Sequence, residues 1–174
     1  MHATAQRKPR TATQQADITV RSLANLPQDV VQRIVNTICS DEYVNAALKT
    51  DQRRPGFIAH PCVDYLGAFV DDKLVGVFAL VEASDIETDL HAMLMREAIP
   101  HSRELGRACI EYALSIPGVR RLTAYVSSAR PSVINYCMRL GFIHEGTRRE
   151  AETRGGFLFD VHVLGMTRAD CIGG

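Results

Sequence analysis

The sequence predicts a single α/β (α+β) domain in which helices flank a mixed, mostly antiparallel sheet. Three observations support this. Helical and strand periodicities alternate along the chain, paired apolar runs are separated by short turns, and a C-terminal helix passes directly into a strand. That helix places its apolar residues at i, i+3, i+4 and i+7, on one face: Val133, Tyr136, Cys137 and Leu140. Gly141 supplies a left-handed cap that ends it.

Composition limits the class of protein. The 174 residues, 46% hydrophobic and 23% charged, suit one globular domain. Twenty basic side chains balance twenty acidic ones, so we expect neither nucleic acid nor a membrane as a partner. The five scattered cysteines indicate reduced thiols, and no cysteine or histidine pair has zinc-ligand spacing, so we expect no metal. No run approaches the roughly 18 apolar residues of a membrane span, and the N-terminus is polar. We expect a cytoplasmic protein.

The N-terminal segment differs from the rest of the chain. Residues 1–16 contain Arg7, Lys8 and Arg10 but no large apolar residue that could anchor them. They are predicted to form a flexible basic tail, and residues 17–174 the domain. Docking of this tail on a protein partner or a larger assembly is the alternative.

The first elements follow from local patterns. Alternation predicts a strand over residues 17–23, and Pro27 suits the first turn of the helix that follows. Ser40-Asp41 predicts the cap of a second short helix through Leu48, and residues 50–61 read as a loop. The first helix should bury a single stripe: Val30, Val31, Ile34, Val35 and Ile38.

The central region predicts three strands. Residues 65–70 and 73–81 form a hairpin around an Asp-Asp-Lys turn, and residues 85–95 form a third strand. This third strand has Leu90, Ala92 and Leu94 on one face, and Asp89, His91 and Met93 on the other. The second face is the more polar one, so chemistry is expected there.

The C-terminal half continues with alternating elements. Residues 96–103 are predicted to be a polar loop, followed by a helix over residues 104–114 and a strand over 122–126. The helix should bury one stripe: Leu105, Ala108, Cys109 and Tyr112. After the 132–140 helix, strands over 142–149 and 156–165 are joined at Gly155-Gly156.

The order of these elements and the Leu140-Gly141-Phe142 corner, followed by a strand carrying Glu145-Gly146, resemble the GNAT acyl-CoA-dependent N-acetyltransferases over about residues 17–168. The resemblance implies the GNAT fold, in which the fourth and fifth strands splay apart. It further implies that the pantetheine arm of acetyl-CoA lies in the gap. The pyrophosphate would rest on the N-terminus of the next helix, where free N–H groups and the helix dipole attract anions.

The resemblance also implies cofactor-binding residues. The family pattern is Gln or Arg, two residues, Gly, one residue, then Gly or Ala, and it matches six residues here: Arg103, Glu104, Leu105, Gly106, Arg107 and Ala108. The pyrophosphate site would then be the loop from Pro100, with Met93, Met95 and Arg130 also contacting the cofactor. A shifted site at residues 96–101 is an alternative, and Gly106 can instead serve helix packing.

Candidate catalytic residues lie on the third central strand and on the last long helix. Asp89 and His91 are two residues apart and point to the same side, and a histidine ordinarily titrates near neutrality, so they are candidates for the base. A histidine bonded into the edge of the core is the alternative for His91. The resemblance implies a tyrosine acid, but its usual position falls on Cys137, and Tyr136 is rotated by about 100° around the helix. The acid is therefore Tyr136, Cys137 or a water, unless Tyr136 only fills the buried stripe.

Two classes of function follow from the resemblance. The first is transfer of an acetyl group from acetyl-CoA to a primary amine, on a small molecule or a protein, by direct attack in a ternary complex. The sequence after Glu145 is similar in style to the branch that acetylates protein N-termini. The second is a structural or interaction protein with the GNAT fold and a degenerate site, similar to compact relatives encoded by phages. Such a protein would be virion-associated.

Overall fold

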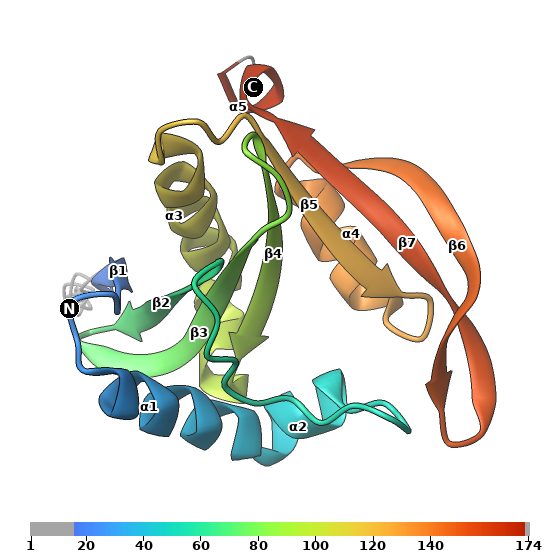
Figure 1. Ribbon diagram of the computed structural model, residues 1–174, viewed down its shortest axis with the longest axis horizontal. Coiled ribbons are helices and arrows are strands. Elements are labelled where there is room, and N and C mark those ends of the chain that lie inside the picture. The colour runs from blue at the N-terminus through green and yellow to red at the C-terminus, as the bar shows by residue number, and fades with distance from the viewer. Residues whose placement is uncertain (1–15, 173–174) are drawn as a thin grey trace, which may run out of the picture.

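The computed structural model describes residues 16–172, which form a seven-stranded sheet in the order β1-β2-β3-β4-β5-β7-β6 with helices against it (Figure 1). The strands are β1 Ile18–Ser22, β2 Val63–Val70, β3 Lys73–Glu82, β4 Glu87–Leu94, β5 Arg121–Ser127, β6 Ile143–Arg154 and β7 Phe157–Thr167. The helices are α1 Gln28–Ser40, α2 Glu42–Leu48, η1 Arg96–His101 (a 3-10 helix), α3 Ser102–Ser115, α4 Pro131–Arg139 and α5 Arg168–Ile172. The predicted tail lies outside the described residues, apart from residue 16.

Most of the predicted elements are present. Helix α1 buries Val31, Val35 and Ile38, and Pro27 immediately precedes it rather than lying within it. The side chain of Asp41 accepts a hydrogen bond from the Val44 N–H at 3.1 Å, so it caps α2 as expected. No helix within residues 16–172 has the length and apolar character needed to span a membrane.

Both predicted hairpins form through two-residue turns in the left-handed region. Asp71 and Asp72, between β2 and β3, have φ values of 49° and 60°. Gly155 and Gly156, between β6 and β7, have φ values of 57° and 77°. Such turns match the right-handed twist of the paired strands, and glycine and aspartate tolerate them best.

Two clusters of buried side chains occupy the two faces of the sheet. On one face, α3 and α4 pack on the sheet through residues such as Leu105, Cys109 and Leu122, all fully buried. On the other face, α1 and α2 cover a second cluster that includes Val35 and Val77. The sheet therefore separates two packed layers, and a side chain on β4 points to one or the other.

The sheet divides between β4 and β5. These parallel strands pair only from Glu87–Asp89 to Arg121–Thr123, whereas β4 remains paired with β3 as far as Leu94. Figure 1 shows β5 diverging from β4 beyond this short paired segment, with α2 near the wide end of the gap. The backbone of β4 after Asp89 therefore lacks a strand partner on its β5 side, as the predicted splay requires.

The loop predicted for residues 96–103 is wrong, because the chain is helical there. The 3-10 helix η1 runs directly into α3, which begins at Ser102. The Ser102 N–H bonds to the Ile99 carbonyl, and its hydroxyl also donates to that oxygen at 2.8 Å. Ala98 is fully buried and fixes this turn against the core. The buried stripe of α3 differs too, because Ala108 and Tyr112 are only half-buried while Gly106, Ile110 and Ala113 are buried.

The junction after α4 has the predicted form. Pro131 occupies the first turn of α4, and Gly141 follows the helix with a φ of 105°. The Phe142 N–H bonds back to the Cys137 carbonyl at 3.1 Å, which satisfies a carbonyl at the helix end. Phe142 is itself buried, so the corner directs the chain from α4 into the core before β6 begins.

Candidate active site

A groove of about 640 Å³ lies where β4 and β5 separate. Residues from β4, α3, β5, α4, β6 and the segment after α2 line it. It brings together six of the predicted site residues: Asp89, His91, Gly106, Arg130, Tyr136 and Cys137. The groove therefore connects the polar face of β4 with the helices that cover the opposite face of the sheet.

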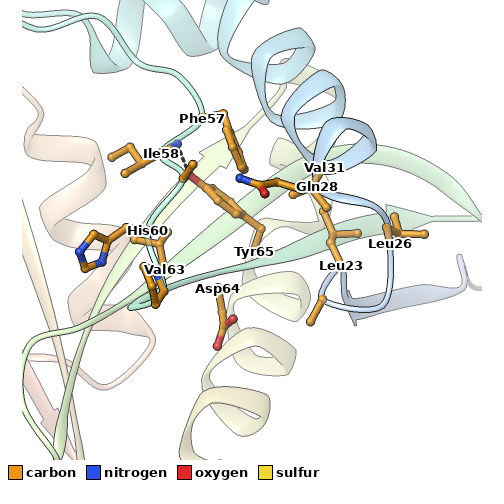
Figure 2. Close-up of a pocket in the computed structure, with 13 residues that line it drawn as sticks. Leu23, Leu26, Gln28, Val31, Phe57, Ile58, His60, Val63, Asp64 and Tyr65 are labelled. Atoms are coloured by element: carbon orange, nitrogen blue, oxygen red, sulfur yellow. Dashed lines mark hydrogen bonds between the residues drawn. The ribbon is translucent and has the colours of Figure 1, made fainter.

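A second cavity, of about 460 Å³, lies between β2, the start of α1 and the segment before β2 (Figure 2). Its lining includes Tyr65, whose hydroxyl accepts a hydrogen bond from the Ile58 N–H at 2.8 Å. The predicted catalytic and cofactor-binding residues are absent from this lining. The groove between β4 and β5 is accordingly the candidate active site.

Asp89 and His91 form the polar wall of the groove. Their neighbours on β3 are Val81 and Ala79, and Ala79 belongs to the cluster on the α1 face, so both side chains point toward that layer. One carboxylate oxygen of Asp89, Oδ1, is buried and has no hydrogen-bond partner among residues 16–172. A buried acceptor without a partner is costly, so this oxygen is well suited to receive a donor from a bound molecule.

Burial shifts the pKa of both groups toward their neutral forms. The pKa of Asp89 is raised by burial, which the His91 charge opposes and Glu87 reinforces. The pKa of His91 is lowered by burial, against the attraction of Asp89. His91 retains solvent access at the groove surface. A neutral imidazole at physiological pH is the form that can accept a proton from an ammonium group.

Tyr136 and Cys137 lie on the helical side of the groove. The Tyr136 hydroxyl donates to the Ser102 carbonyl at 2.7 Å, which connects α4 to the first turn of α3. Burial raises the pKa of Tyr136 and raises the pKa of Cys137 to about 11. Both groups therefore keep their protons at neutral pH, and the raised pKa makes each a weaker acid than an exposed side chain of its type.

Gly106 allows α3 and α4 to approach each other. A Cβ atom at this position would lie 2.7 Å from Leu140 Cδ1 and even closer to the Tyr136 hydroxyl oxygen. Tyr136 belongs to α4 and Leu140 caps its C-terminal end, so the absence of a side chain at Gly106 is explained by helix packing. The packing role considered for this glycine is thus present in the structure.

The predicted pyrophosphate loop is not a loop. Residues 103–108 lie inside α3, where backbone N–H groups bond within the helix instead of pointing at a ligand. Leu105 is fully buried, whereas Arg103, Glu104 and Arg107 are exposed. The continuous helical segment begins earlier, at Arg96. An anion held by a helix start would therefore sit nearer residues 96–101, which is the shifted position considered from the sequence.

Of the remaining predicted cofactor residues, the two methionines pack in the core and Arg130 lines the groove. Met93 is buried against α1, with its Sδ atom 3.5 Å from Cys39 Sγ, and Met95 packs on the same cluster. Both side chains therefore point into the cluster on the α1 face, and the Met95 N–H bonds to the Val75 carbonyl of β3 at 2.9 Å, away from the gap between β4 and β5. Arg130 lines the groove, but its guanidinium donates to the Ala46 carbonyl of α2.

An ion-pair group at the closed end of the groove was missed by the sequence reasoning. Arg121 of β5 bonds to Glu87 of β4 at 3.1 Å and to Glu145 of β6 at 2.9 Å. Thr123 also donates to Glu87. A Cβ atom at Gly165 of β7 would collide with the Arg121 and Glu145 side chains, so this glycine leaves space for the pair to cross β7. The group holds together three strands where β4 and β5 are still paired.

Contacts across the wide end of the groove were also not predicted. The Asp51 carboxylate accepts hydrogen bonds from the Gly155 and Gly156 N–H groups at 2.7 and 3.0 Å, and its own N–H donates to the Thr153 carbonyl at 3.0 Å. Arg154 donates to the Ala47 carbonyl at 3.1 Å. We call this set the hairpin bridge, because it joins the β6–β7 hairpin to α2 and to the segment after it. Figure 1 shows that segment reaching toward the hairpin tip.

No protein-family model and no curated protein sequence matches the chain. The structure is nevertheless similar to solved structures of the spermidine N-acetyltransferase SpeG from Vibrio cholerae. A complex of that enzyme with CoA and spermine has a TM-score of 0.72 at 15% identity, covering 90% of this chain and 98% of that one. A chimera of the Vibrio cholerae enzyme and hSSAT has a TM-score of 0.74 at 15% identity, with 90% and 99% covered. The chain therefore has the fold of the GNAT N-acetyltransferases, as its sequence predicted.

Proposed function

We propose that this protein is an acetyl-CoA-dependent N-acetyltransferase that acetylates a primary amine by direct attack in a ternary complex. The observation that carries the proposal is the pair Asp89 and His91, which lies in a groove where β4 and β5 have separated. The described similarity to N-acetyltransferases of known structure supports it. A cytoplasmic location is proposed as well, supported by five cysteines that all remain free thiols.

The residues present fit the pantetheine arm of acetyl-CoA better than its pyrophosphate. Beyond Asp89, the β4 backbone has unpaired polar groups facing β5, and apolar side chains such as Leu90, Ala92 and Val126 line the groove. An amide-containing, largely aliphatic arm can bond to this backbone and pack on these side chains. When bound, acetyl-CoA would supply an acetyl group activated as a thioester. The pyrophosphate would be held near the start of η1, with Arg96 exposed there.

Each proton of the reaction has a candidate group. Neutral His91 accepts a proton from the ammonium form of the acceptor, and Asp89 stabilises the resulting imidazolium. The amine nitrogen freed in this way would bond to the acetyl carbon as the carbon–sulfur bond breaks. The second proton lost from that nitrogen would balance the proton that the departing thiolate takes up. Tyr136 and Cys137 both carry one at neutral pH. Because the Tyr136 hydroxyl already donates to the Ser102 carbonyl, it would have to break that bond to act as the acid.

Cofactor binding is tested first, by the melting temperature with and without acetyl-CoA and with a sulfate control. Ligand at about 100 times its dissociation constant adds ~2.7 kcal/mol of stability. This amounts to a shift of roughly 5 to 10 °C for a chain of this size. A shift of that order supports a cofactor site, and acceptors can then be screened by CoA release.

The role of His91 is tested by His91→Ala. If His91 is the base, kcat falls by about 10² to 10⁴-fold while the acetyl-CoA shift is kept. In the wild type, the acid limb of kcat/KM should lie below the ordinary histidine pKa of about 6.5, because burial lowers the pKa of His91. His144, an exposed histidine of β6, provides the matched control as His144→Ala. Unchanged turnover in His91→Ala would assign His91 a structural role.

A non-catalytic interaction protein with the GNAT fold is the second candidate. The observation that favours it is the helical conformation of residues 103–108, because a helix interior offers no free N–H groups to a pyrophosphate. A well-folded protein that shows no melting shift at millimolar acetyl-CoA would support this function instead. The search would then turn to a protein partner.

A further inference from the structure

We infer that the acceptor is a small amine that carries a carboxylate, and not a polyamine. This inference rests on the proposed acetyltransferase function and names the substrate class of the same groove. It is carried by an unpaired carboxylate and an unpaired arginine on one face of the groove, Asp89 and Arg148.

The charged residues that line the groove are predominantly basic. They are Arg53, Arg130, Arg148, Arg154, Asp89 and Glu152. Glu152 pairs with Arg154, and Arg154 and Arg130 also donate to carbonyls of α2. Among residues 16–172, the side chains of Arg148 and Arg53 make no hydrogen bond or ion pair, and Asp89 Oδ1 has no partner. The groups left for a ligand are therefore one carboxylate and two guanidinium groups.

Asp89 and Arg148 lie on the same face of the sheet. In the strand register, Asp89 is paired with Thr123 of β5. Arg148 is paired with Val161 of β7, which is paired in turn with Ser127 of β5. Four residues of strand separate Thr123 from Ser127, or about 13 Å. Strand β6 lies three strands from β4, at least about 14 Å across the sheet, so the long Arg148 side chain has to span this separation to line the groove. Tyr125 lies between them, and its pKa, raised mainly by burial, is also raised by Asp89 and lowered by Arg148. An amine beside Asp89 and His91 would thus have an anion site further along the same groove.

This arrangement favours a carboxylate over a second ammonium group. A guanidinium binds a carboxylate through two parallel N–H···O bonds, which is the strongest common pairing for that anion. A polyamine would bring additional positive charges toward Arg148 and Arg53, where like charges repel. The spermine-bound structural neighbour is therefore a guide to the fold and not to the acceptor of this chain.

The hairpin bridge limits the size of the acceptor. Asp51, Thr153 and Arg154 form contacts across the wide end, and Thr153 and Arg154 also line the groove. A folded protein that entered from this end would have to displace these contacts to reach Asp89. A small molecule can occupy the space beneath them.

The test uses amines that differ only in the carboxylate. L-lysine is compared with cadaverine, and γ-aminobutyrate with butylamine, with spermidine as a third probe, by CoA release at fixed acetyl-CoA. The expected result is a kcat/KM at least roughly 10-fold higher for the carboxylate member of a pair, the effect of one charge-assisted interaction. Arg148→Ala should remove this preference through KM, and Arg148→Lys should restore part of it. Arg149→Ala, one residue away and outside the groove lining, should leave the preference intact.

Three outcomes would overturn the inference: a preference for cadaverine or spermidine in the wild type, acetylation of acidic peptides alone, or a carboxylate preference that survives Arg148→Ala. Failure of the proposed function is recognised separately, by the absence of both an acetyl-CoA melting shift and any turnover. In that case, calorimetric titration of L-lysine and γ-aminobutyrate into the wild type and into Arg148→Ala still decides whether the anion site exists. Binding that depends on Arg148 supports the anion site, and no binding overturns it.

Discussion

Replacing Gly106 with alanine tests the contact between α3 and α4 on which the position of Tyr136 depends. The added methyl carbon would lie 2.7 Å from Leu140 Cδ1, well inside the roughly 3.5 to 4.0 Å of a favourable carbon–carbon contact. Overpacking of this kind costs about 1 to 3 kcal/mol. Loss of the hydrogen bond from Tyr136 to Ser102 would add about 0.5 to 1.5 kcal/mol.

Helix propensity acts in the opposite direction. Alanine is favoured over glycine in a helix interior by about 0.8 to 1 kcal/mol. The net expectation is a loss of about 2 kcal/mol, with bounds of about 0.5 and 4. For a chain of this size, a loss of ~2 kcal/mol lowers the melting temperature by roughly 4 to 8 °C. Urea unfolding followed by circular dichroism measures the free energy of unfolding directly.

Two further variants make this prediction specific. Gly146→Ala is the control, because a Cβ atom there meets nothing within 4 Å. Tyr136→Phe removes the hydroxyl that lies closest to the new methyl group, so Gly106→Ala should cost less in that background. Coupling between such neighbours is typically about 0.5 to 3 kcal/mol. If Gly106→Ala instead stabilises the protein by about 1 kcal/mol, propensity acts alone and the described packing of α4 is refuted.

Two other predictions concern Asp89 and Asp51. Burial raises the pKa of Asp89, so its contribution to stability falls as pH rises from the unfolded value of about 3.9 through the folded value. The stability of Asp89→Asn relative to the wild type should therefore rise as the pH increases above about 4, while activity is lost. A pH-independent difference in urea midpoints would contradict this. Asp51→Ala removes two hydrogen bonds of the hairpin bridge, at about 0.5 to 1.5 kcal/mol each. In Asp51→Ala, amide hydrogen exchange should accelerate at the β6–β7 turn. The control is Asp64→Ala, which alters an exposed aspartate of β2 and should leave that exchange unchanged. Equal exchange rates in both variants would show that the bridge does not hold the hairpin.

The elements that could be predicted are those specified by neighbouring residues. The α1 stripe, the Asp41 cap, the two-residue turns and the Gly141 corner all depend on periodicity or on a local backbone requirement. The segment after β4 could not be assigned in this way. Its polar composition suggested a loop, whereas the segment is helical and Ala98 packs in the core. Burial of a single small residue depends on tertiary structure, which local pattern does not contain.

The candidate site was predicted in part for the same reason. Asp89 and His91 share a strand face, so alternation alone placed them together. Arg121 and Glu145 are 24 residues apart, and only the register of β5, β7 and β6 brings them into contact. The space above Gly165 that admits them is likewise a property of three strands. The hairpin bridge joins residues more than 100 positions apart, so no single-sequence pattern indicates it.

The Arg121 ion pairs have a mechanical consequence for the groove. They fix β4, β5 and β6 to one another at the end where the Thr123 hydroxyl donates to Glu87. With that end anchored, a rotation of β5 relative to β4 displaces Thr123 very little and Ser127, at the far end of the strand, the most. The width of the groove is therefore set by the angle between β4 and β5. A small change of angle at the anchored end would shift the space around Arg148 more than the space around Asp89. The proposed anion site would therefore move only if the hairpin bridge at the wide end yields, while the reacting end keeps its geometry.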